Sequence, residues 1–139
     1  MTPPPAAGYS GTPLVQKLGI RPGHRLRLIG APRGFAETVG PLPAAVRVFT
    51  GRVDSLDCVL LFVTTVAELE QEFAPTARTL APAGMLWIAW PKKASKVPTD
   101  VTENRIRDIG LDAGLVDVKV CAIDNVWSGL KFVRRLRDR

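Results

Sequence analysis

The sequence has few of the residues that enzymes use for nucleophilic or metal chemistry. Its 139 residues include one histidine and two cysteines. Cys58 and Cys121 each lie in an apolar run without a Cys-x-x-Cys pair or a Cys/His cluster, so we expect reduced, packed thiols. His24 has no carboxylate or nucleophile at a spacing that would pair with it. These absences disfavour a Ser/His/Asp triad and predict no metal site.

Long apolar runs are also missing. No stretch of about 18 apolar residues occurs, so we predict no membrane-spanning helix. The first eleven residues carry neither a basic region nor an apolar run, so we expect no signal peptide and a cytoplasmic protein. With 46% hydrophobic residues, the chain has the composition of one globular domain. We assign a flexible segment to residues 1–8, the domain to 9–136 and a basic tail to 137–139.

Positive charge is unevenly distributed along the chain. The formal net charge is +6, and the last nine residues hold five basic residues and one acidic residue. Most of the excess charge therefore belongs to the C-terminal end. That segment lacks interleaved aromatic residues, which favours a solvated edge strand and tail over a nucleic-acid-binding surface. We therefore disfavour nucleic acid as a partner.

Strand and helix patterns alternate along the chain. Helices are expected after Thr12-Pro13, at 33–40, after the capping box Thr65 to Glu68, and after a second capping box, Asp100 to Glu103. Apolar runs predict strands at 25–29, 46–49, 57–63, 85–90, 115–123 and 129–136. This alternation predicts a single α/β domain with a mostly parallel sheet of about six strands. The last two strands are joined by about five residues, so they should form an antiparallel hairpin.

Two interruptions are expected within this pattern. Pro75 falls inside the apolar stripe that follows Thr65, and it predicts a kink or a break in that helix. Pro82-Ala83-Gly84 predicts a turn before the strand at 85–90.

Three segments resemble the second half of a class I methyltransferase-like Rossmann domain. They are Asp57-Cys-Val-Leu-Leu, the run Leu80-Ala-Pro-Ala-Gly84-Met-Leu-Trp-Ile, and Ala113-Gly114-Leu115. The resemblance implies a strand order of 2-1-3-4-6-5. Further segments are similar to an uncharacterised bacterial domain-of-unknown-function family, namely GYSGTPL (8–14), WPKKAS (90–95), VPTDVTE (97–103), GLVDVKVCAID (114–124) and WSGLKFVRR (127–135).

The sequence departs from that methyltransferase pattern where the cofactor would bind. The loop Gly30-Ala-Pro-Arg-Gly34 has Pro32 in place of the middle glycine, which removes an N–H donor. No acidic residue directly follows the strand at 46–49, and one strand–helix pair is missing between residues 50 and 57. We therefore predict no cofactor and disfavour S-adenosylmethionine.

Ligands of open α/β sheets bind beyond the carboxyl ends of the strands. Four segments should meet at that edge: 30–34, 63–66, 90–99 and 124–128. The lysines of 90–99 beside Ser95 suit an anion, two tryptophans could stack on a planar ligand, and the hydroxyls of GYSGTPL could cradle an anion. The candidate ligand-binding residues are Tyr9, Ser10, Thr12, Arg33, Trp90, Lys92, Lys93, Ser95, Asp124 and Trp127.

These observations favour a non-catalytic or degenerate Rossmann-like module of unknown function that binds a small anionic ligand or a protein partner. A divergent S-adenosylmethionine-dependent methyltransferase-like enzyme is the alternative. A basic accessory protein that binds nucleic acid is a second alternative.

Overall fold

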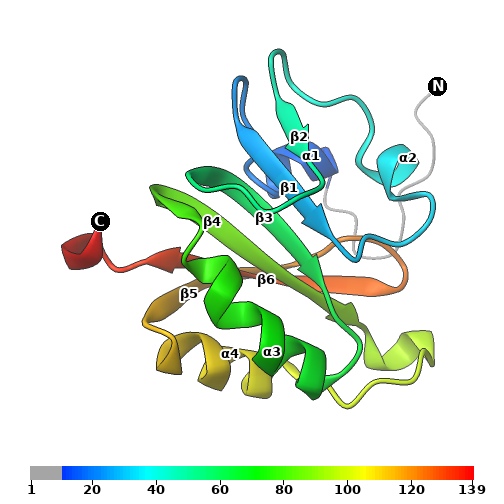
Figure 1. The fold of residues 1–139 in the computed structure, drawn as a ribbon. Coiled ribbons are helices and arrows are strands. Elements are labelled where there is room, and N and C mark those ends of the chain that lie inside the picture. Colours follow the sequence, from blue (N-terminus) through cyan, green and yellow to red (C-terminus); the bar gives the residue numbers. More distant parts are fainter. Residues whose placement is uncertain (1–10) are drawn as a thin grey trace.

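Six strands form one sheet in the computed structural model, which describes residues 11–139 (Figure 1). They pair in the order β2-β1-β3-β4-β6-β5, which confirms the expected order. The first four strands run parallel, whereas β6 is antiparallel to both β4 and β5. The α/β fold class is therefore confirmed. The strands are β1 (Arg25–Ile29), β2 (Arg47–Phe49), β3 (Leu56–Phe62), β4 (Leu80–Pro91), β5 (Leu115–Ala122) and β6 (Trp127–Arg134).

Helices cover both faces of the sheet. Leu69, Phe73 and Ile106 bring α3 and α4 onto one face, which is the front in Figure 1. Leu18, at the end of α1, and Phe35, the first residue of α2, pack against the opposite face. Successive residues of β3 and β4 pack alternately into these two cores, because side chains along a strand point to opposite faces in turn. The helices are α1 (Leu14–Lys17), α2 (Phe35–Val39), α3 (Val66–Ala77) and α4 (Glu103–Asp112), with short 3-10 turns η1 (Lys93–Ser95) and η2 (Leu136–Asp138).

Close packing fixes α4 and α1 against the sheet. Gly110 lets α4 approach β6, because a Cβ at that position would collide with the Phe132 ring. Phe132 also meets Phe73 of α3 edge to face, with centroids 5.2 Å apart. On the other face, the fully buried Trp87 donates its indole N–H to the Leu18 carbonyl at 2.9 Å. The buried polar atom of the tryptophan is thereby satisfied.

The two expected capping boxes have different outcomes. Thr65 caps α3 by accepting the Glu68 N–H on its hydroxyl, and the Glu68 carboxylate accepts the Thr65 N–H. These two hydrogen bonds confirm the first capping box. The second is wrong: the N-cap of α4 is Thr102, whose hydroxyl accepts from the Arg105 N–H. Asp100 instead accepts a hydrogen bond from the Val66 N–H at 2.8 Å, so it serves the start of the neighbouring helix.

Three further boundaries differ from expectation. Thr12 does not cap α1, whose N-cap is Pro13 without a side-chain hydrogen bond. Pro75 does not break α3; it lies in the last turn, where the helix continues for only two residues. Residues 82–84 belong to β4, whose pairing with β3 is irregular there. Gly84 is required at that place, because a Cβ would lie 2.5 Å from the Leu56 carbonyl oxygen.

The connection from β2 to β3 contains no helix. Residues 50–55 pass directly from one strand to the other, on the face that carries α3, because Val53 packs against that core. The α3 face of β1 and β2 therefore has no helix over it. Among the helices of residues 11–139, none is long and apolar enough to cross a membrane. The assigned segment 1–8 lies outside the described residues.

Candidate functional site

The four segments expected at the carboxyl edge of the sheet do meet there. A Cβ on Gly30 would lie 3.0 Å from the Phe62 carbonyl oxygen, so the loop after β1 touches the end of β3. The Thr99 hydroxyl donates to the Thr64 carbonyl at 2.6 Å. The Lys92 N–H donates to the Val126 carbonyl, also at 2.6 Å. These contacts join the loops after β1, β3 and β4 to the turn between β5 and β6.

Left-handed glycines shape the loop after β1. Gly30 and Gly34 have φ values of +69° and +86°, a region in which glycine has no steric penalty. Pro32 between them has a structural task, because its carbonyl accepts the Phe35 N–H at 3.2 Å as α2 begins. The space beside Gly34 is open, and the nearest atom to its Cβ position is a carboxylate oxygen of Glu37, 4.0 Å away. The backbone at Gly34 is therefore accessible to a ligand.

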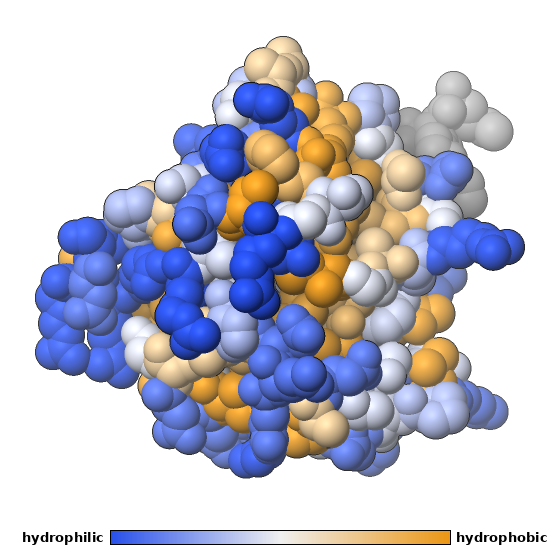
Figure 2. Space-filling model, in the orientation of Figure 1, coloured by the Kyte–Doolittle hydropathy of each residue, from blue (hydrophilic) through white to orange (hydrophobic). Residues whose placement is uncertain are grey.

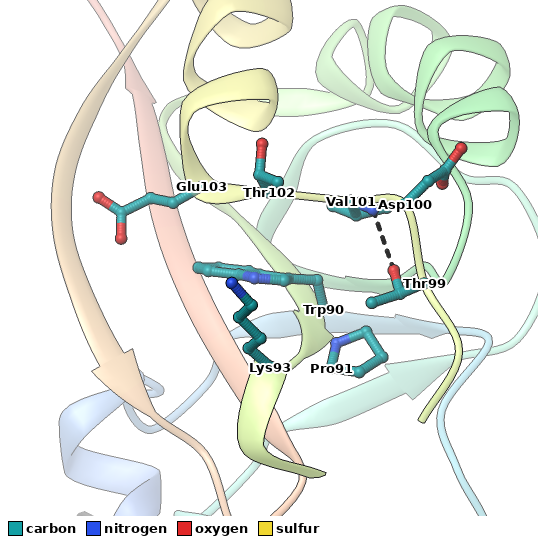
Figure 3. A pocket seen from close by; sticks show the side chains of 8 residues that line it. All are labelled: Trp90, Pro91, Lys93, Thr99, Asp100, Val101, Thr102 and Glu103. Carbon is teal, nitrogen blue, oxygen red and sulfur yellow. Dashed lines mark hydrogen bonds between the residues drawn. The ribbon is translucent and has the colours of Figure 1, made fainter. Parts of the chain in front are cut away.

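A pocket of about 350 Å³ lies at the end of β4, between β4 and the segment that leads into α4 (Figure 3). Trp90 presents the flat face of its indole to this pocket, and Lys93 extends beside the ring. Asp100, Thr102 and Glu103 line the opposite side. Trp90 is only 8% exposed, so the pocket has a fixed apolar floor and a charged rim.

Part of the lysine-containing segment 90–99 is held by hydrogen bonds within the segment itself. The Ser95 hydroxyl donates to the Lys92 carbonyl at 2.6 Å and accepts from the Val97 N–H. It therefore stabilises the 3-10 turn η1. Lys93 and Lys96 are exposed, and Lys92 is half-buried. The ammonium group of Lys93 is the part of this loop that reaches a pocket.

The turn between β5 and β6 is held by Asp124. Its Oδ1 atom accepts the N–H groups of Val126 and Trp127, each at 2.8 Å. The Trp127 ring packs against Phe62 at 5.2 Å, in the core opposite to that of Trp90. Trp90 and Trp127 therefore lie on opposite faces of the sheet, and a ligand-binding role for either stays a prediction. Trp127 pairs with Pro91, the residue after Trp90, and successive residues of a strand point to opposite faces.

The remaining candidate residues are dispersed. Arg33 is exposed in the loop after β1, and Thr12 is exposed before α1. Tyr9 and Ser10 lie outside the described residues. A ligand-binding role for any of the ten candidates stays a prediction.

The residues expected to be inert have internal explanations. Burial raises the pKa of the Cys58 thiol to about 12, with Lys131 opposing the shift and Asp57 adding to it. Burial also raises the pKa of the half-buried Cys121. His24 accepts the Arg21 N–H on its Nδ1 atom at 3.1 Å in a tight turn. Neither thiol is poised to act as a thiolate.

Two carboxylates at this edge escaped the sequence analysis. Asp100 was assigned to its own helix, whereas its partner lies 34 positions away in the chain. Glu37 drew no attention, because it follows the glycine loop on α2 rather than ending a strand. It forms no hydrogen bond or ion pair with other residues of the described range. Only its position beside Gly34 marks it, and that position depends on the folded loop.

No protein-family model matches the sequence, and no curated protein matches it. The structure is similar to a SAM-dependent methyltransferase from Aquifex aeolicus, with a TM-score of 0.60, 16% identity, and 86% of each chain covered. It is also similar to Aeropyrum pernix fibrillarin with natively bound S-adenosyl-L-methionine, with a TM-score of 0.56 and 15% identity over 86% of this chain and 73% of that one. These likenesses show the methyltransferase-like Rossmann fold; the resemblance to a domain-of-unknown-function family found no support.

A third neighbour is the 1,6-didemethyltoxoflavin-N1-methyltransferase of Burkholderia thailandensis with bound S-adenosylhomocysteine, with a TM-score of 0.59 and 14% identity over 88% of this chain and 76% of that one. The prediction of no cofactor is contradicted by these neighbours, which are a SAM-dependent methyltransferase and two proteins with bound S-adenosyl-L-methionine or S-adenosylhomocysteine. The argument from Pro32 failed for a local reason. That proline forms the turn into α2, while the backbone beside Gly34 remains open.

Proposed function

We propose that this chain binds S-adenosylmethionine at the carboxyl edge of its sheet and transfers the methyl group to a small acceptor. One observation carries the proposal: the strand order reverses between β1 and β3, and the glycine loop 30–34 leaves β1 at that point. Ligands of doubly wound sheets bind at such a reversal. The similar structures named above favour this function over a non-catalytic module for an anionic ligand or a protein partner.

The residues present fit an adenosyl ligand in one respect and depart from the family in another. The open backbone at Gly34 allows close approach. The segment after β2 brings no carboxylate to this edge, because Thr50, Gly51 and Arg52 follow the strand. Glu37 lies beside Gly34 and supplies the missing acid in our proposal, with its carboxylate accepting hydrogen bonds from the ribose hydroxyls.

The cofactor, when bound, supplies a methyl group on a positively charged sulfur that a nucleophile can displace. The chain supplies the site for that nucleophile. In our proposal the acceptor lies on the face of Trp90 in the pocket at the end of β4. Asp100 and Glu103 also line this pocket, but Asp100 accepts the Val66 N–H and Glu103 pairs with Arg107, so in our proposal the proton that the acceptor loses passes to solvent.

Calorimetric titration with S-adenosylhomocysteine tests cofactor binding. We expect saturable binding to the wild-type protein and affinity weaker by about tenfold in Glu37→Gln, since one charged hydrogen-bond acceptor contributes about 1.4 kcal/mol or more. Glu72→Gln is the matched control: it makes the same change on α3 and should bind as the wild type does. The absence of any heat with either S-adenosylmethionine or S-adenosylhomocysteine at millimolar concentration would contradict the proposal.

Transfer is tested separately with methyl-labelled S-adenosylmethionine and a small-molecule extract. The wild-type protein should move label into a product, and Trp90→Phe should reduce the rate while leaving S-adenosylhomocysteine affinity unchanged. Retention of the wild-type rate in Trp90→Phe would remove the Trp90 pocket from the proposal.

A further inference from the structure

The face of β1 and β2 that lacks a helix carries unpaired arginines. Arg25 of β1 lies directly opposite Arg47 of β2 in the parallel register. Both guanidinium groups lie over the Phe49 ring, at 4.7 and 5.7 Å from its centroid. Arg27 follows on the same face, since Leu26 between them enters the opposite core. Three cations thus occupy the place that a helix would cover.

One carboxylate lies beside these cations, because Asp57 Oδ2 accepts the Arg25 backbone N–H at 2.8 Å, but it forms no ion pair with them. Among residues 11–139, no carboxylate oxygen lies within ion-pairing distance of these three guanidinium groups. The Nε atoms of Arg25 and Arg27 are buried without a hydrogen-bond partner. Like charges directly opposite each other across two strands destabilise a sheet. The arrangement therefore costs stability without a compensating ion pair.

The C-terminal arginines continue the same positive surface. Arg134 donates from Nη2 to the carbonyls of Ala77 and Leu80, at 3.0 and 2.9 Å. Leu80 pairs with Leu56 at the start of β3. Two residues before Leu56, the Asp54 carbonyl accepts a hydrogen bond from Arg25. The tail therefore reaches the edge of the sheet at which the parallel strands begin.

We define the arginine surface as the arginines along this amino edge and on the adjoining bare face. Figures 1 and 2 show the C-terminal segment and the starts of the strands on one side of the molecule, with strongly hydrophilic residues over it. Asp54, Asp57 and Asp138 are acidic residues nearby: Asp138 forms an ion pair with Arg137 at 4.0 Å, and the Asp57 carboxylate accepts the Arg25 backbone N–H at 2.8 Å. The members are Arg25, Arg27, Arg47, Arg78, Arg134, Arg135, Arg137 and Arg139.

We propose that the arginine surface binds the phosphodiester backbone of a nucleic acid. Its span from β2 to β6 covers four strand spacings, about 19 Å. That length matches about five or six phosphates of one strand at about 3.4 Å each. Guanidinium groups bind phosphate oxygens in a fork geometry that ammonium groups lack.

An acidic protein segment is the competing occupant, and the composition of the surface argues against it. Protein interfaces have an apolar centre surrounded by a polar rim. In the tail, Leu136 is the one large apolar side chain that is mostly exposed, at 80%. On the bare face, Phe49 is already covered by Arg25 and Arg47. Repeated single charges without an apolar centre match a polyphosphate backbone better.

Fluorescence anisotropy with a labelled 20-nucleotide single-stranded RNA tests this inference on the full chain. The test variant carries Arg47→Gln, Arg78→Gln, Arg137→Gln and Arg139→Gln, all at exposed positions. The matched control removes four exposed charges elsewhere, through Arg33→Gln, Lys93→Gln, Lys96→Gln and Lys119→Gln. Circular dichroism and thermal melts establish that both variants fold.

We expect salt-dependent binding by the wild-type protein and affinity at least tenfold weaker in the arginine variant at 50 mM salt. The slope of log affinity against log salt should decrease by up to about three, since each lost phosphate contact removes about 0.7. The control should stay within about threefold of the wild type. DNA of the same sequence distinguishes the kind of nucleic acid, and either one supports the proposal.

Three results would overturn it. The first is no binding by the wild-type protein at low salt. The second is an equal loss of RNA affinity in the arginine variant and the control variant, which would show that binding depends on net charge and not on the arginine surface. The third is tighter binding of a polyglutamate peptide than of RNA or DNA, which would assign the surface to an acidic protein. None of these outcomes bears on cofactor binding at the opposite edge, so the two proposals can fail separately.

Discussion

The two ends of the sheet differ in whether their charged side chains are bound by other groups of the fold. At the carboxyl edge, Asp100 and Asp124 are held by backbone N–H groups, and Glu68 by backbone and hydroxyl donors. At the amino edge, Arg25 and Arg47 face each other without an ion pair, and the Asp57 carboxylate accepts the Arg25 backbone N–H at 2.8 Å. β3, with seven residues, separates the ends by about 23 Å. Three carboxylates of the carboxyl edge are thus bound by donors of the fold itself, whereas the opposed arginines of the amino edge form no ion pair and leave their charge available to a partner.

The same contrast appears among the arginines themselves. On α4, Arg107 bonds both Glu103 at 2.6 Å and Asp117 at 2.9 Å, and Arg105 bonds Glu70 at 2.6 Å. These side chains connect α4 to its neighbours. The fold can pair arginines where they serve packing, so the unpaired arginines of the amino edge call for another explanation.

The largest expected effect comes from disturbing the carboxyl edge at Gly30. Gly30→Ala places a Cβ 3.0 Å from the Phe62 backbone oxygen in a left-handed conformation. We expect a loss of about 2–4 kcal/mol in the free energy of unfolding, measured with urea, together with weakened S-adenosylhomocysteine binding. Gly114→Ala is the control, because Gly114 has φ +91° and no atom within 4 Å of its Cβ position. It should lose only about 1–2 kcal/mol, the cost of a left-handed alanine without a steric collision. RNA binding should persist in both variants. Loss of RNA binding in Gly30→Ala would contradict the view that the two edges of the sheet are independent binding sites.

A smaller effect should follow from removing the shared cap of α3. Thr65→Ala and Asp100→Ala each delete an acceptor for a backbone N–H at the start of that helix. Each should cost about 1 kcal/mol of unfolding free energy. Because the two acceptors serve the same helix end, the double variant should deviate from additivity in a urea-denaturation cycle. Asp100→Asn, which keeps an acceptor oxygen, should retain most of the stability, and a full loss there would contradict a capping role.

Acidification should weaken the paired region before it affects the arginine surface. Hydrogen bonds from the Thr64 and Thr65 backbone and hydroxyl groups lower the pKa of Glu68, and the hydrogen bond from Arg107 lowers that of Asp117. A lowered folded pKa stabilises the fold above the ordinary values of 4.5 and 3.8. That stability is lost as pH falls through the lower folded values. Urea midpoints between pH 7 and 2 should decrease less steeply in Asp117→Asn, and Arg107→Gln should flatten the profile in the same way.

The smallest effect concerns the opposed arginines. Arg47→Gln removes one of two like charges that face each other, so it should raise the free energy of unfolding by a few tenths of a kcal/mol at low salt. The gain should disappear at 0.5 M salt, where the Debye length is below about 5 Å. Thermal melts at both salt concentrations measure it. Destabilisation at low salt would show that Arg47 supports the fold, through its contact with Phe49, more than it opposes Arg25.

Local signals predicted most of the elements and few of the side-chain roles. The box Thr65 to Glu68 is formed within four residues of sequence, so its geometry follows from the sequence alone. Asp100 shows the limit, because its partner is the Val66 N–H of another helix. Trp90 and Trp127 were expected on one site, and the register Pro91 to Trp127 placed them on opposite faces. A shift of one residue in the pairing register moves a side chain to the other face of the sheet, and no local sequence pattern specifies the register of β4 against β6.

The sequence by itself determined the alternation of strands and helices, the parallel sheet and the antiparallel end, because periodicity, caps and connection lengths are local properties. Tertiary structure alone decided which charges meet. The C-terminal excess of positive charge was visible in the chain, but its union with Arg25, Arg27 and Arg47 required the pairing of β1 with β2 and of Leu56 with Leu80. Electrostatic surfaces depend on distances through space, and residues separated by about a hundred positions become neighbours only when the sheet forms.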